Sequence, residues 1–421
     1  MRIITALVCT ILILLNSVPP VYAVSSSDPP EIRGEGAYLI DVQSGQTLYS
    51  KNGDELFAPA STTKIMTGLL AIEKGNLDDI VTLSSTMLDY QTVYGTRIYL
   101  EPGEQMSLRD LLYALLLNSA NDAAVGIAEH IGGSLDQFVS MMNVKAKDLG
   151  LTNTTFKNPS GLSEEGHMTT PHDLARIAQA AYANPIFREY IQTKRHTITR
   201  SKPDVPTVMI NENKLLSENP YVNGMKTGYT AAAKNCLVAS ASKDGRELIG
   251  VILKSPGREI YSDMENLLDY GFSQFQTTVN KPAGSAIAKM TIGSEEINML
   301  SVSPIYTTRK VGETVSEPTL KIIPLETNVT EIEQDQTVGT VEVWNGNEKT
   351  GTISLISDRS VKPKQSLGNN YQRVIFLILF VFSVITLLFV QSKRSAVRKL
   401  RCSRSKKKEA QLQKAKNTDL I

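Results

Sequence analysis

The chain has 421 residues, of which 41% are hydrophobic, and this length allows two packed domains because a single hydrophobic core usually stops growing near about 250–300 residues. Its 44 basic and 43 acidic residues leave a formal net charge of +1. That balance argues against nucleic acid or another polyanion as a partner of the chain as a whole.

Residues 1–23 have the features of a cleavable signal peptide. A cation at Arg2 precedes an apolar run over residues 3–15, and small side chains lead to Ala23, after which we expect cleavage. The alternative is an uncleaved anchor helix, which needs about 20 apolar residues, and this run is shorter. The sequence therefore predicts an exported protein.

The segment after the leader mixes helical spacing of apolar residues with short strands joined by turns. A hairpin is predicted over residues 37–50, and a second strand pair over residues 236–242 and 247–254. Helices are predicted over residues 59–75, 108–118, 123–130, 135–149, 172–183 and 260–270. We therefore expect residues 24–276 to form an α+β domain in which helices flank an antiparallel sheet.

The pattern changes after this domain. Residues 277–360 lose the helical period and contain short strand-like runs between turns, which predicts a small all-β domain. Residues 361–373 are polar and are predicted to be a linker. Residues 374–390 are apolar apart from Ser383 and Thr386, so they predict a C-terminal transmembrane helix.

A basic tail follows this apolar stretch and decides between two interpretations of it. A buried core helix is the alternative to a membrane span, but residues 391–421 are rich in lysine and arginine, which stay on the cytoplasmic side of a membrane. We therefore expect a protein anchored in the cytoplasmic membrane, with the bulk of the chain outside and the basic tail in the cytoplasm.

Three short motifs occur in order along the predicted α+β domain. They are Ser61-Thr62-Thr63-Lys64, Ser119-Ala120-Asn121 and Lys226-Thr227-Gly228. Each alone is a weak signal, because the chain holds further copies of the first and third patterns. Those copies begin at Ser240, Ser403, Ser405 and Lys349. Spacing cannot choose between the copies, so the choice depends on the predicted element that carries each one.

The predicted elements favour Ser61 as a nucleophile. Ser61 lies at the start of a predicted helix, where the helix dipole is positive, and Lys64 falls on the same face one turn later. Ser240 instead lies in a predicted strand, and the other two copies lie in the basic tail. Likewise Lys226 begins a predicted strand pair, whereas Lys349 lies in a turn of the predicted all-β domain.

A serine hydroxyl is a poor nucleophile at neutral pH and needs an adjacent base. Lys64 can be that base if it is uncharged. Burial and a second cation nearby can lower the pKa of a lysine far enough for this, and Lys226 would supply the cation. A helix cap at Ser61 and a solvated Lys64 are the ordinary alternatives, and the occurrence of three motifs in order argues against them.

Together the motifs resemble the active site of penicillin-recognising serine enzymes. Further segments resemble, in order and spacing, the low-molecular-mass penicillin-binding proteins that are D-alanyl-D-alanine carboxypeptidases. These segments are NPSGL, MTTPHDLARIA, NENKLL and LLDYGF. The likeness extends over about residues 34–360 and implies a catalytic domain with the β-lactamase/transpeptidase-like fold.

The resemblance implies a role for each motif residue. Ser61 would attack the carbonyl between the two terminal D-alanines of a peptidoglycan peptide after Lys64 removes its proton, and an acyl-enzyme would form. Ser119 would relay a proton to the leaving amine, and Asn121 would bind the substrate amide. Lys226 would stabilise charge and orient Ser119. β-Lactam antibiotics would acylate the same serine.

The resemblance also implies the groups that hold the substrate. The backbone N–H groups of Ser61 and Tyr229 would form an oxyanion hole. Thr227, followed by Gly228, would bind the substrate carboxylate, with Arg258 as a further helper. Water would then release the shortened peptide.

Other functions of the same motifs stay open at this stage. A β-lactamase shares them, but no family-like Glu-x-x-x-Asn pattern follows Asn121 to activate a water for fast deacylation. A DD-endopeptidase differs only in substrate access, and a cell-wall receptor without turnover is disfavoured by the intact motifs. No metal or other cofactor is expected, because His167 and His172 form no ligand pattern.

Overall fold

The computed structural model describes residues 28–314, 317–325, 330–362 and 368–416. The predicted signal peptide therefore lies outside the described residues. The described chain divides into two compact units, and the second unit consists of residues 291–297, 330–334, 359–362 and the long C-terminal helix.

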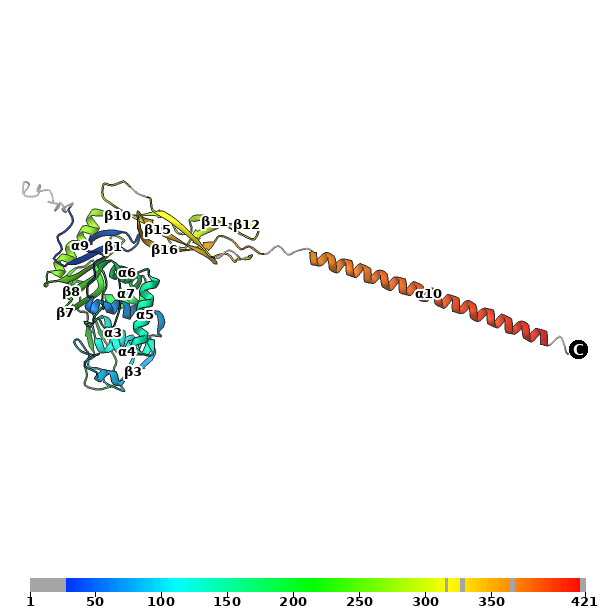
Figure 1. The fold of residues 1–421 in the computed structure, drawn as a ribbon, viewed down its shortest axis with the longest axis horizontal. Coiled ribbons are helices and arrows are strands. Elements are labelled where there is room, and N and C mark those ends of the chain that lie inside the picture. The colour runs from blue at the N-terminus through cyan, green and yellow to red at the C-terminus, as the bar shows by residue number, and fades with distance from the viewer. Residues whose placement is uncertain (1–27, 315–316, 326–329, 363–367, 417–421) are drawn as a thin grey trace, which may run out of the picture. The chain divides into compact units, whose positions relative to one another are not determined.

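A five-stranded antiparallel sheet forms the centre of the first unit (Figure 1). Its strands, in spatial order, are β2 (Thr47–Lys51), β1 (Gly36–Asp41), β9 (Arg246–Ser255), β8 (Lys234–Lys243) and β7 (Val222–Thr230). The predicted hairpins over residues 37–50 and 236–254 are both present and are joined by the pairing of β1 with β9.

Side chains of this sheet alternate between two hydrophobic cores, as the period of a strand requires. Ala37 and Leu39 of β1 pack in the smaller core with α9 (Ile260–Gln274), whereas Tyr38 and Ile40 face the larger core. The predicted antiparallel sheet with helices on both faces is thus confirmed.

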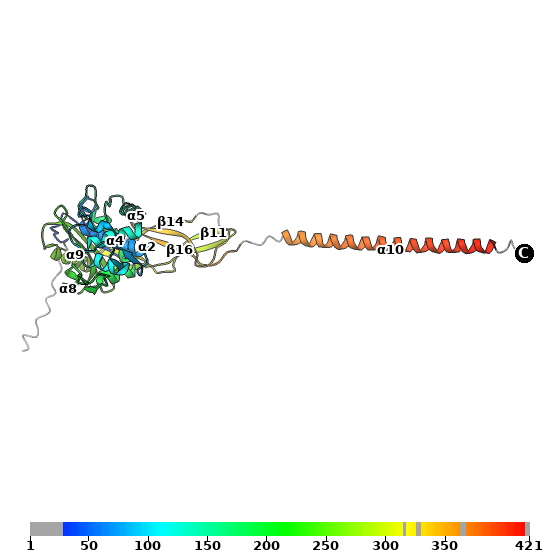
Figure 2. The ribbon, with the colours of Figure 1, turned by 90° about the horizontal axis from the view of Figure 1, so that it is seen from below.

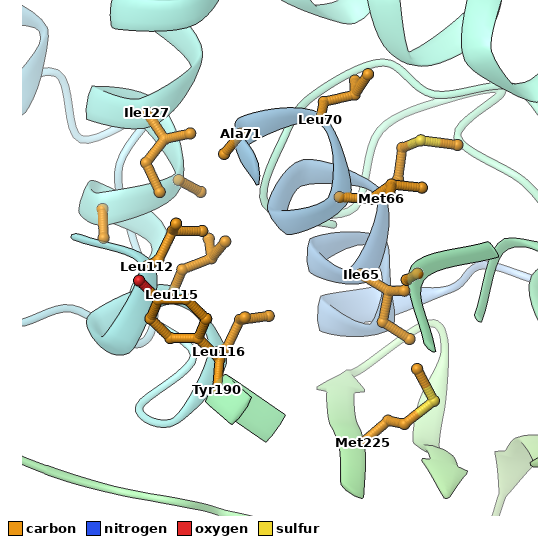
Figure 3. Packing of buried hydrophobic residues seen from close by; sticks show 14 of the residues in the cluster. Ile65, Met66, Leu70, Ala71, Leu112, Leu115, Leu116, Ile127, Tyr190 and Met225 are labelled. Atoms are coloured by element: carbon orange, nitrogen blue, oxygen red, sulfur yellow. The ribbon is translucent and has the colours of Figure 1, made fainter. Parts of the chain in front are cut away.

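The larger core lies between the sheet and a group of helices. Three of these helices, α2 (Lys64–Lys74), α3 (Leu108–Leu116) and α4 (Asn121–Gly132), carry the first two motifs or adjoin them. Figure 3 shows Ala71 of α2 on the side of the helix toward Ile127 of α4, and Ile65 on the side toward Met225 of β7, with all four side chains buried. The other elements of this region are α5 (Leu135–Asp148), α6 (Pro171–Tyr182), α7 (Pro185–Gln192), α8 (Leu215–Glu218), the 3-10 helix η2 (Ser85–Leu88), and the strand pairs β3 (Ile80–Thr82) with β4 (Gln105–Ser107) and β5 (Arg195–Thr197) with β6 (Val208–Ile210).

Strands replace helices after α9, as the sequence predicts. They are β10 (Phe275–Lys281), β11 (Ala286–Ile292), β12 (Glu295–Ser301), β13 (Ile305–Lys310), β14 (Thr319–Pro324), β15 (Thr337–Asn345) and β16 (Glu348–Ser357). β10 pairs with β13, and the others form a sheet in the order β11-β12-β16-β15-β14, part of which is seen in Figure 2. The predicted β-rich second region is confirmed.

Polar contacts within the first unit tie these later strands to the first hairpin. Arg176 of α6 donates to Glu348 over 2.6 Å, and Thr47 of β2 lies 2.8 Å from the same carboxylate. Thr277 of β10 donates to Asp41 over 2.5 Å. The backbone N–H of Thr308 donates to the Gln46 side chain.

The second unit contains α10 (Gly368–Lys416), which is long and apolar enough, over Tyr371–Gln411, to cross a membrane. The helix begins inside the stretch predicted as a linker and continues through most of the basic tail. Alanine, leucine, lysine, arginine and glutamine are good helix formers, so the loss of apolar character after residue 390 does not end the helix.

Candidate active site

Ser61 lies in a short 3-10 helix, η1 (Ala60–Thr63), which leads directly into α2. The Thr62 hydroxyl donates to the carbonyl of Pro59 over 2.6 Å, and the backbone N–H of Lys64 donates to the carbonyls of Ser61 and Thr62. The predicted helix start is therefore a tighter 3-10 turn, with Lys64 as the first residue of the α-helix.

Lys64 is fully buried, and its ammonium nitrogen has three oxygen neighbours. Nζ lies 3.0 Å from Ser61 Oγ, 2.7 Å from Asn121 Oδ1 and 2.7 Å from the carbonyl oxygen of Ser160. The two carbonyl-type oxygens can only accept. An uncharged Lys64 would donate its two N–H groups to them, and its lone pair would then face the Ser61 hydroxyl, which is the geometry of a general base.

The surroundings favour that uncharged form. Burial lowers the pKa of Lys64 well below its ordinary value, and the charge of Lys226 lowers it further. Burial also lowers the pKa of Lys226, but the Glu212 carboxylate, 3.8 Å from its Nζ, opposes this. Lys226 is therefore the better candidate for the cation of the pair, and Lys64 for the neutral amine.

Asn121 begins α4 and is fixed at both ends of its side-chain amide. Its Nδ2 donates to the carbonyl of Tyr94 over 2.5 Å, while Oδ1 accepts from Lys64. Its backbone N–H donates to Thr96 over 2.8 Å. Nδ2 keeps a second N–H and Oδ1 a second lone pair, so Asn121 can hold Lys64 and still form the expected bond to a substrate amide.

Ser119 precedes α4 with φ at +60°, a left-handed conformation that is uncommon for serine. Its side chain is buried to 3% exposure and lines the same cavity as Ser61. In the described part of the chain, no hydrogen bond joins its hydroxyl to Lys226, whose Nζ donates to the carbonyl of Thr227 over 3.1 Å. The expected orientation of Ser119 by Lys226 is thus not a direct contact here.

The third motif lies on the edge strand β7, directly beside η1. A Cβ at Gly228 would lie 2.9 Å from the Ser61 nitrogen and 3.1 Å from the Thr62 nitrogen, so only glycine lets the strand pass this close. The backbone of Tyr229 follows immediately. This approach brings the two expected oxyanion-hole amides to the same edge of the site.

A cavity of about 350 Å³ opens at this point, a size that suits a small ligand. It is lined by Ser61, Thr96, Ser119, Glu212, Lys214, Thr227, Gly228, Tyr229, Asn235, Cys236, Leu237, Arg258, Ile260 and Tyr261. Arg258 and Lys214 contribute positive charge to it, as a carboxylate ligand would need. The Thr227 hydroxyl donates to Glu212 over 3.3 Å.

Two members of the site carry no role in the sequence interpretation. One is the Ser160 carbonyl, which lies in the NPSGL segment, and the other is Glu212, which lies in NENKLL. NPSGL and NENKLL are both among the segments that resemble the carboxypeptidase family, so the sequence did mark these two segments. Their contacts were not predictable, because a backbone carbonyl has no sequence signature.

The competing motif copies lie elsewhere. Ser240 is buried in β8 and donates to Asn223 over 2.6 Å. Lys349 pairs with Glu342 over 2.6 Å on the β15–β16 hairpin. His167 is buried and bonds Thr63, and His172 lies at the start of α6, as predicted. Within the described residues, no group of three or more His, Cys, Asp or Glu side chains could hold a metal ion.

The comparisons with known proteins agree with the motif resemblance. Residues 23–257 match the peptidase S11 family, described as D-alanyl-D-alanine carboxypeptidase. The chain is 36% identical over 338 residues to D-alanyl-D-alanine carboxypeptidase DacF of Bacillus subtilis, covering 78% of this chain and 86% of that protein. The crystal structure of the Streptomyces K15 DD-transpeptidase matches with a TM-score of 0.56 and 33% identity, over 58% of this chain and 99% of that one. Penicillin-binding protein 5 from Haemophilus influenzae matches with a TM-score of 0.62 and 27% identity, over 80% of this chain and 99% of that one.

Proposed function

The chain belongs to the peptidase S11 family of D-alanyl-D-alanine carboxypeptidases, and on this premise we propose that it removes the terminal D-alanine from peptidoglycan pentapeptide side chains through an acyl-enzyme on Ser61. It is a serine-type carboxypeptidase of the penicillin-binding class. The observation that carries the mechanism is the arrangement of Ser61, Asn121 and the Ser160 carbonyl around a buried Lys64 nitrogen.

Acylation begins with proton transfer from Ser61 Oγ to uncharged Lys64 Nζ while Oγ bonds to the carbonyl carbon of the penultimate D-alanine. The carbonyl oxygen takes up the negative charge and accepts hydrogen bonds from the backbone N–H groups of Ser61 and Tyr229. Asn121 keeps Lys64 in position during the transfer, because its Oδ1 accepts one of the lysine N–H groups.

Collapse of this intermediate breaks the C–N bond, and the leaving D-alanine amine needs a proton. Lys64 gives up the proton it took, through Ser119, which lines the same cavity. The terminal carboxylate of the substrate lies against Thr227 and Arg258, with Lys226 adding positive charge. Water, activated by the again neutral Lys64, then hydrolyses the ester and releases the shortened peptide.

A β-lactam places a strained amide where the D-Ala-D-Ala bond lies and acylates the same serine.

We propose that the enzyme is exported, that α10 anchors it in the cytoplasmic membrane, and that the basic tail after residue 390 stays in the cytoplasm. The positive charges of that tail support this orientation. External proteolysis of intact cells should then digest the catalytic region and spare an epitope placed after residue 416.

Release of D-alanine from diacetyl-Lys-D-Ala-D-Ala tests the activity directly. The wild-type chain should release it and should be labelled by fluorescent penicillin, whereas Ser61→Ala should do neither while keeping its thermal denaturation midpoint. Cleavage of crosslinked dimers without D-alanine release from the peptide would indicate an endopeptidase instead. Peptide binding with no release at all would refute the enzymatic proposal.

A further inference from the structure

A cluster of aromatic side chains lies on the loop between η2 and β4, beside the catalytic cavity. Tyr90, Tyr94 and Tyr99 are 72%, 42% and 65% exposed. The same loop contributes Thr96 to the lining of the cavity. Large exposed apolar groups that gather in one place mark interaction sites. We call Tyr90, Tyr99 and Arg97, which are in contact through the arginine, the tyrosine platform.

The backbone beneath the tyrosine platform is firmly held. The buried carboxylate of Asp122 accepts hydrogen bonds from the N–H groups of Ile98 and Leu100, over 3.1 and 3.0 Å. Arg200 donates to the carbonyls of Ile98 and Tyr99, over 2.8 and 3.2 Å. The side chains of Ile98 and Leu100 are buried. The exposed rings thus stand on an ordered support, which lowers the entropy cost of binding a ligand.

Tyr99 has φ at +60°, in the left-handed region. This conformation is unfavourable for a bulky side chain and is normally taken by glycine or asparagine. Such strain persists only where the surroundings enforce it, and it concentrates at functional sites. The Tyr99 ring is largely exposed, so burial of this ring does not compensate for the unfavourable backbone conformation.

Arg97 lies between two rings of the tyrosine platform. Its Cζ is 5.5 Å from the ring centroid of Tyr90 and 5.4 Å from that of Tyr99. Its only hydrogen bond in the described part of the chain is a long one, 3.4 Å, to the carbonyl of Val93. Its Nε is buried without a partner among the described residues. A ligand cannot reach this buried nitrogen, but Nη2 makes no hydrogen bond in the described part of the chain and stays available as a donor.

We propose that the tyrosine platform binds the glycan strand of peptidoglycan next to the stem peptide whose end enters the catalytic cavity. The inference rests on the proposed function, because the stem peptide is covalently attached to that strand. The C–H faces of pyranose rings stack on the negative faces of aromatic rings. Arg97 donates to the acetamido carbonyls and hydroxyls of the same sugars. A ligand with both apolar faces and acceptors fits this combination better than a purely apolar one does.

A double variant, Tyr90→Ala with Tyr99→Asn, tests the platform in the full-length protein. Asparagine tolerates the left-handed backbone, so the loop should keep its shape. D-alanine release from diacetyl-Lys-D-Ala-D-Ala should stay at the wild-type rate. With isolated pentapeptide-containing peptidoglycan polymer as substrate, KM should rise about tenfold with kcat unchanged, which corresponds to about 1.4 kcal/mol of binding free energy.

Tyr221→Ala is the matched control. Tyr221 is 42% exposed and has a cation over its ring, Lys243 Nζ at 4.7 Å, but it lies outside the loop that contributes Thr96 to the catalytic cavity. This variant should match the wild type on both substrates. Titration with chitohexaose, a soluble oligomer of N-acetylglucosamine, adds a readout without catalysis, and the double variant should bind it at least about tenfold more weakly than the wild type.

Three results would overturn the proposal. The KM for the polymer could be unchanged in the double variant, or it could rise equally in Tyr221→Ala. The double variant could also lose as much activity on the soluble peptide as on the polymer, which would mean that the platform only shapes the cavity. Failure of the wild type to release D-alanine from either substrate would instead refute the proposed function. The chitohexaose titration would still test the platform in that case.

Discussion

Replacing Gly228 with alanine would place a methyl group against the turn that carries Ser61. The added Cβ would lie 2.9 Å from the Ser61 nitrogen and 3.1 Å from the Thr62 nitrogen and the Ala60 Cβ, whereas ordinary contacts begin at 3.4 Å. The neighbours are backbone atoms and a short side chain, so no flexible group can move away. Strand β7 and η1 must therefore separate by roughly 0.5 Å.

That separation predicts a specific kinetic effect. A misplacement of about 1 Å at a reacting centre can cost about 100-fold in rate, so half of it should slow acylation of Gly228→Ala by roughly tenfold or more. Overpacking of this kind also destabilises a fold by about 1–3 kcal/mol. The loss should fall on the acylation step, because the strand that moves carries the Tyr229 amide of the expected oxyanion hole.

The second Lys-Thr-Gly copy supplies the control. A Cβ at Gly351 meets nothing within 4 Å, so Gly351→Ala should acylate like the wild type. Stopped-flow measurement of fluorescent penicillin acylation gives the second-order rate constant, and thermal denaturation shows whether each variant is folded. A folded Gly228→Ala that acylates at the wild-type rate, or an equal loss in Gly351→Ala, would refute the steric argument.

Three further predictions concern titratable groups. The Glu212 carboxylate opposes the lowering of the Lys64 pKa that burial causes, so Glu212→Gln should move the acidic limb of the acylation pH profile to lower pH, and a shift to higher pH would contradict this. Burial lowers the pKa of His167 to about 4, below its value of about 6.5 in the unfolded chain, so the free energy of unfolding should fall by up to about 3 kcal/mol as pH drops from 6.5 to 4. Urea titrations at pH 6.5 and at pH 4 should show a weaker pH dependence of the free energy of unfolding in His167→Gln than in the wild type. Burial raises the pKa of the Cys236 thiol to about 12, so a thiol reagent at neutral pH should modify Cys402 and spare Cys236 until the chain unfolds; rapid labelling of Cys236 in the native protein would contradict this.

Local spacing predicted the parts of the site that are close in sequence. Ser61 and Lys64 are three residues apart at a helix start, and their side chains meet at 3.0 Å. The contact between Lys64 and Asn121 joins positions 57 residues apart, and no periodicity in the chain specifies it. The family resemblance placed both residues in one site but assigned Asn121 to the substrate amide, so this contact was not predicted, and the roles of these residues stay predictions.

In the fold, too, contacts between residues close in sequence were predictable and contacts between distant residues were not. The hairpin of β8 and β9 follows from two apolar runs around a tight turn, but the pairing of β1 with β9 joins strands about 200 residues apart and depends on tertiary packing. Helix α7 was missed because it is only 8 residues long, although Asn184 as N-cap followed by Pro185 was a usable signal. The predicted helix ended at residue 390, where the apolar residues end, whereas α10 continues to Lys416. Apolar content, and not helix propensity, determined the predicted end.

The hydrogen bonds that Asp41 and Gln46 accept from the strands after α9 bear on how this enzyme could be shortened. A chain ending at residue 276 would remove Thr277 and Thr308. Asp41 would keep its bonds from Ser44 and Arg246, but the Gln46 side-chain oxygen would lose the backbone N–H of Thr308. A buried acceptor left without a donor costs about 1–3 kcal/mol. A shortened soluble enzyme would therefore gain stability from a replacement at position 46, whereas position 41 could stay as it is.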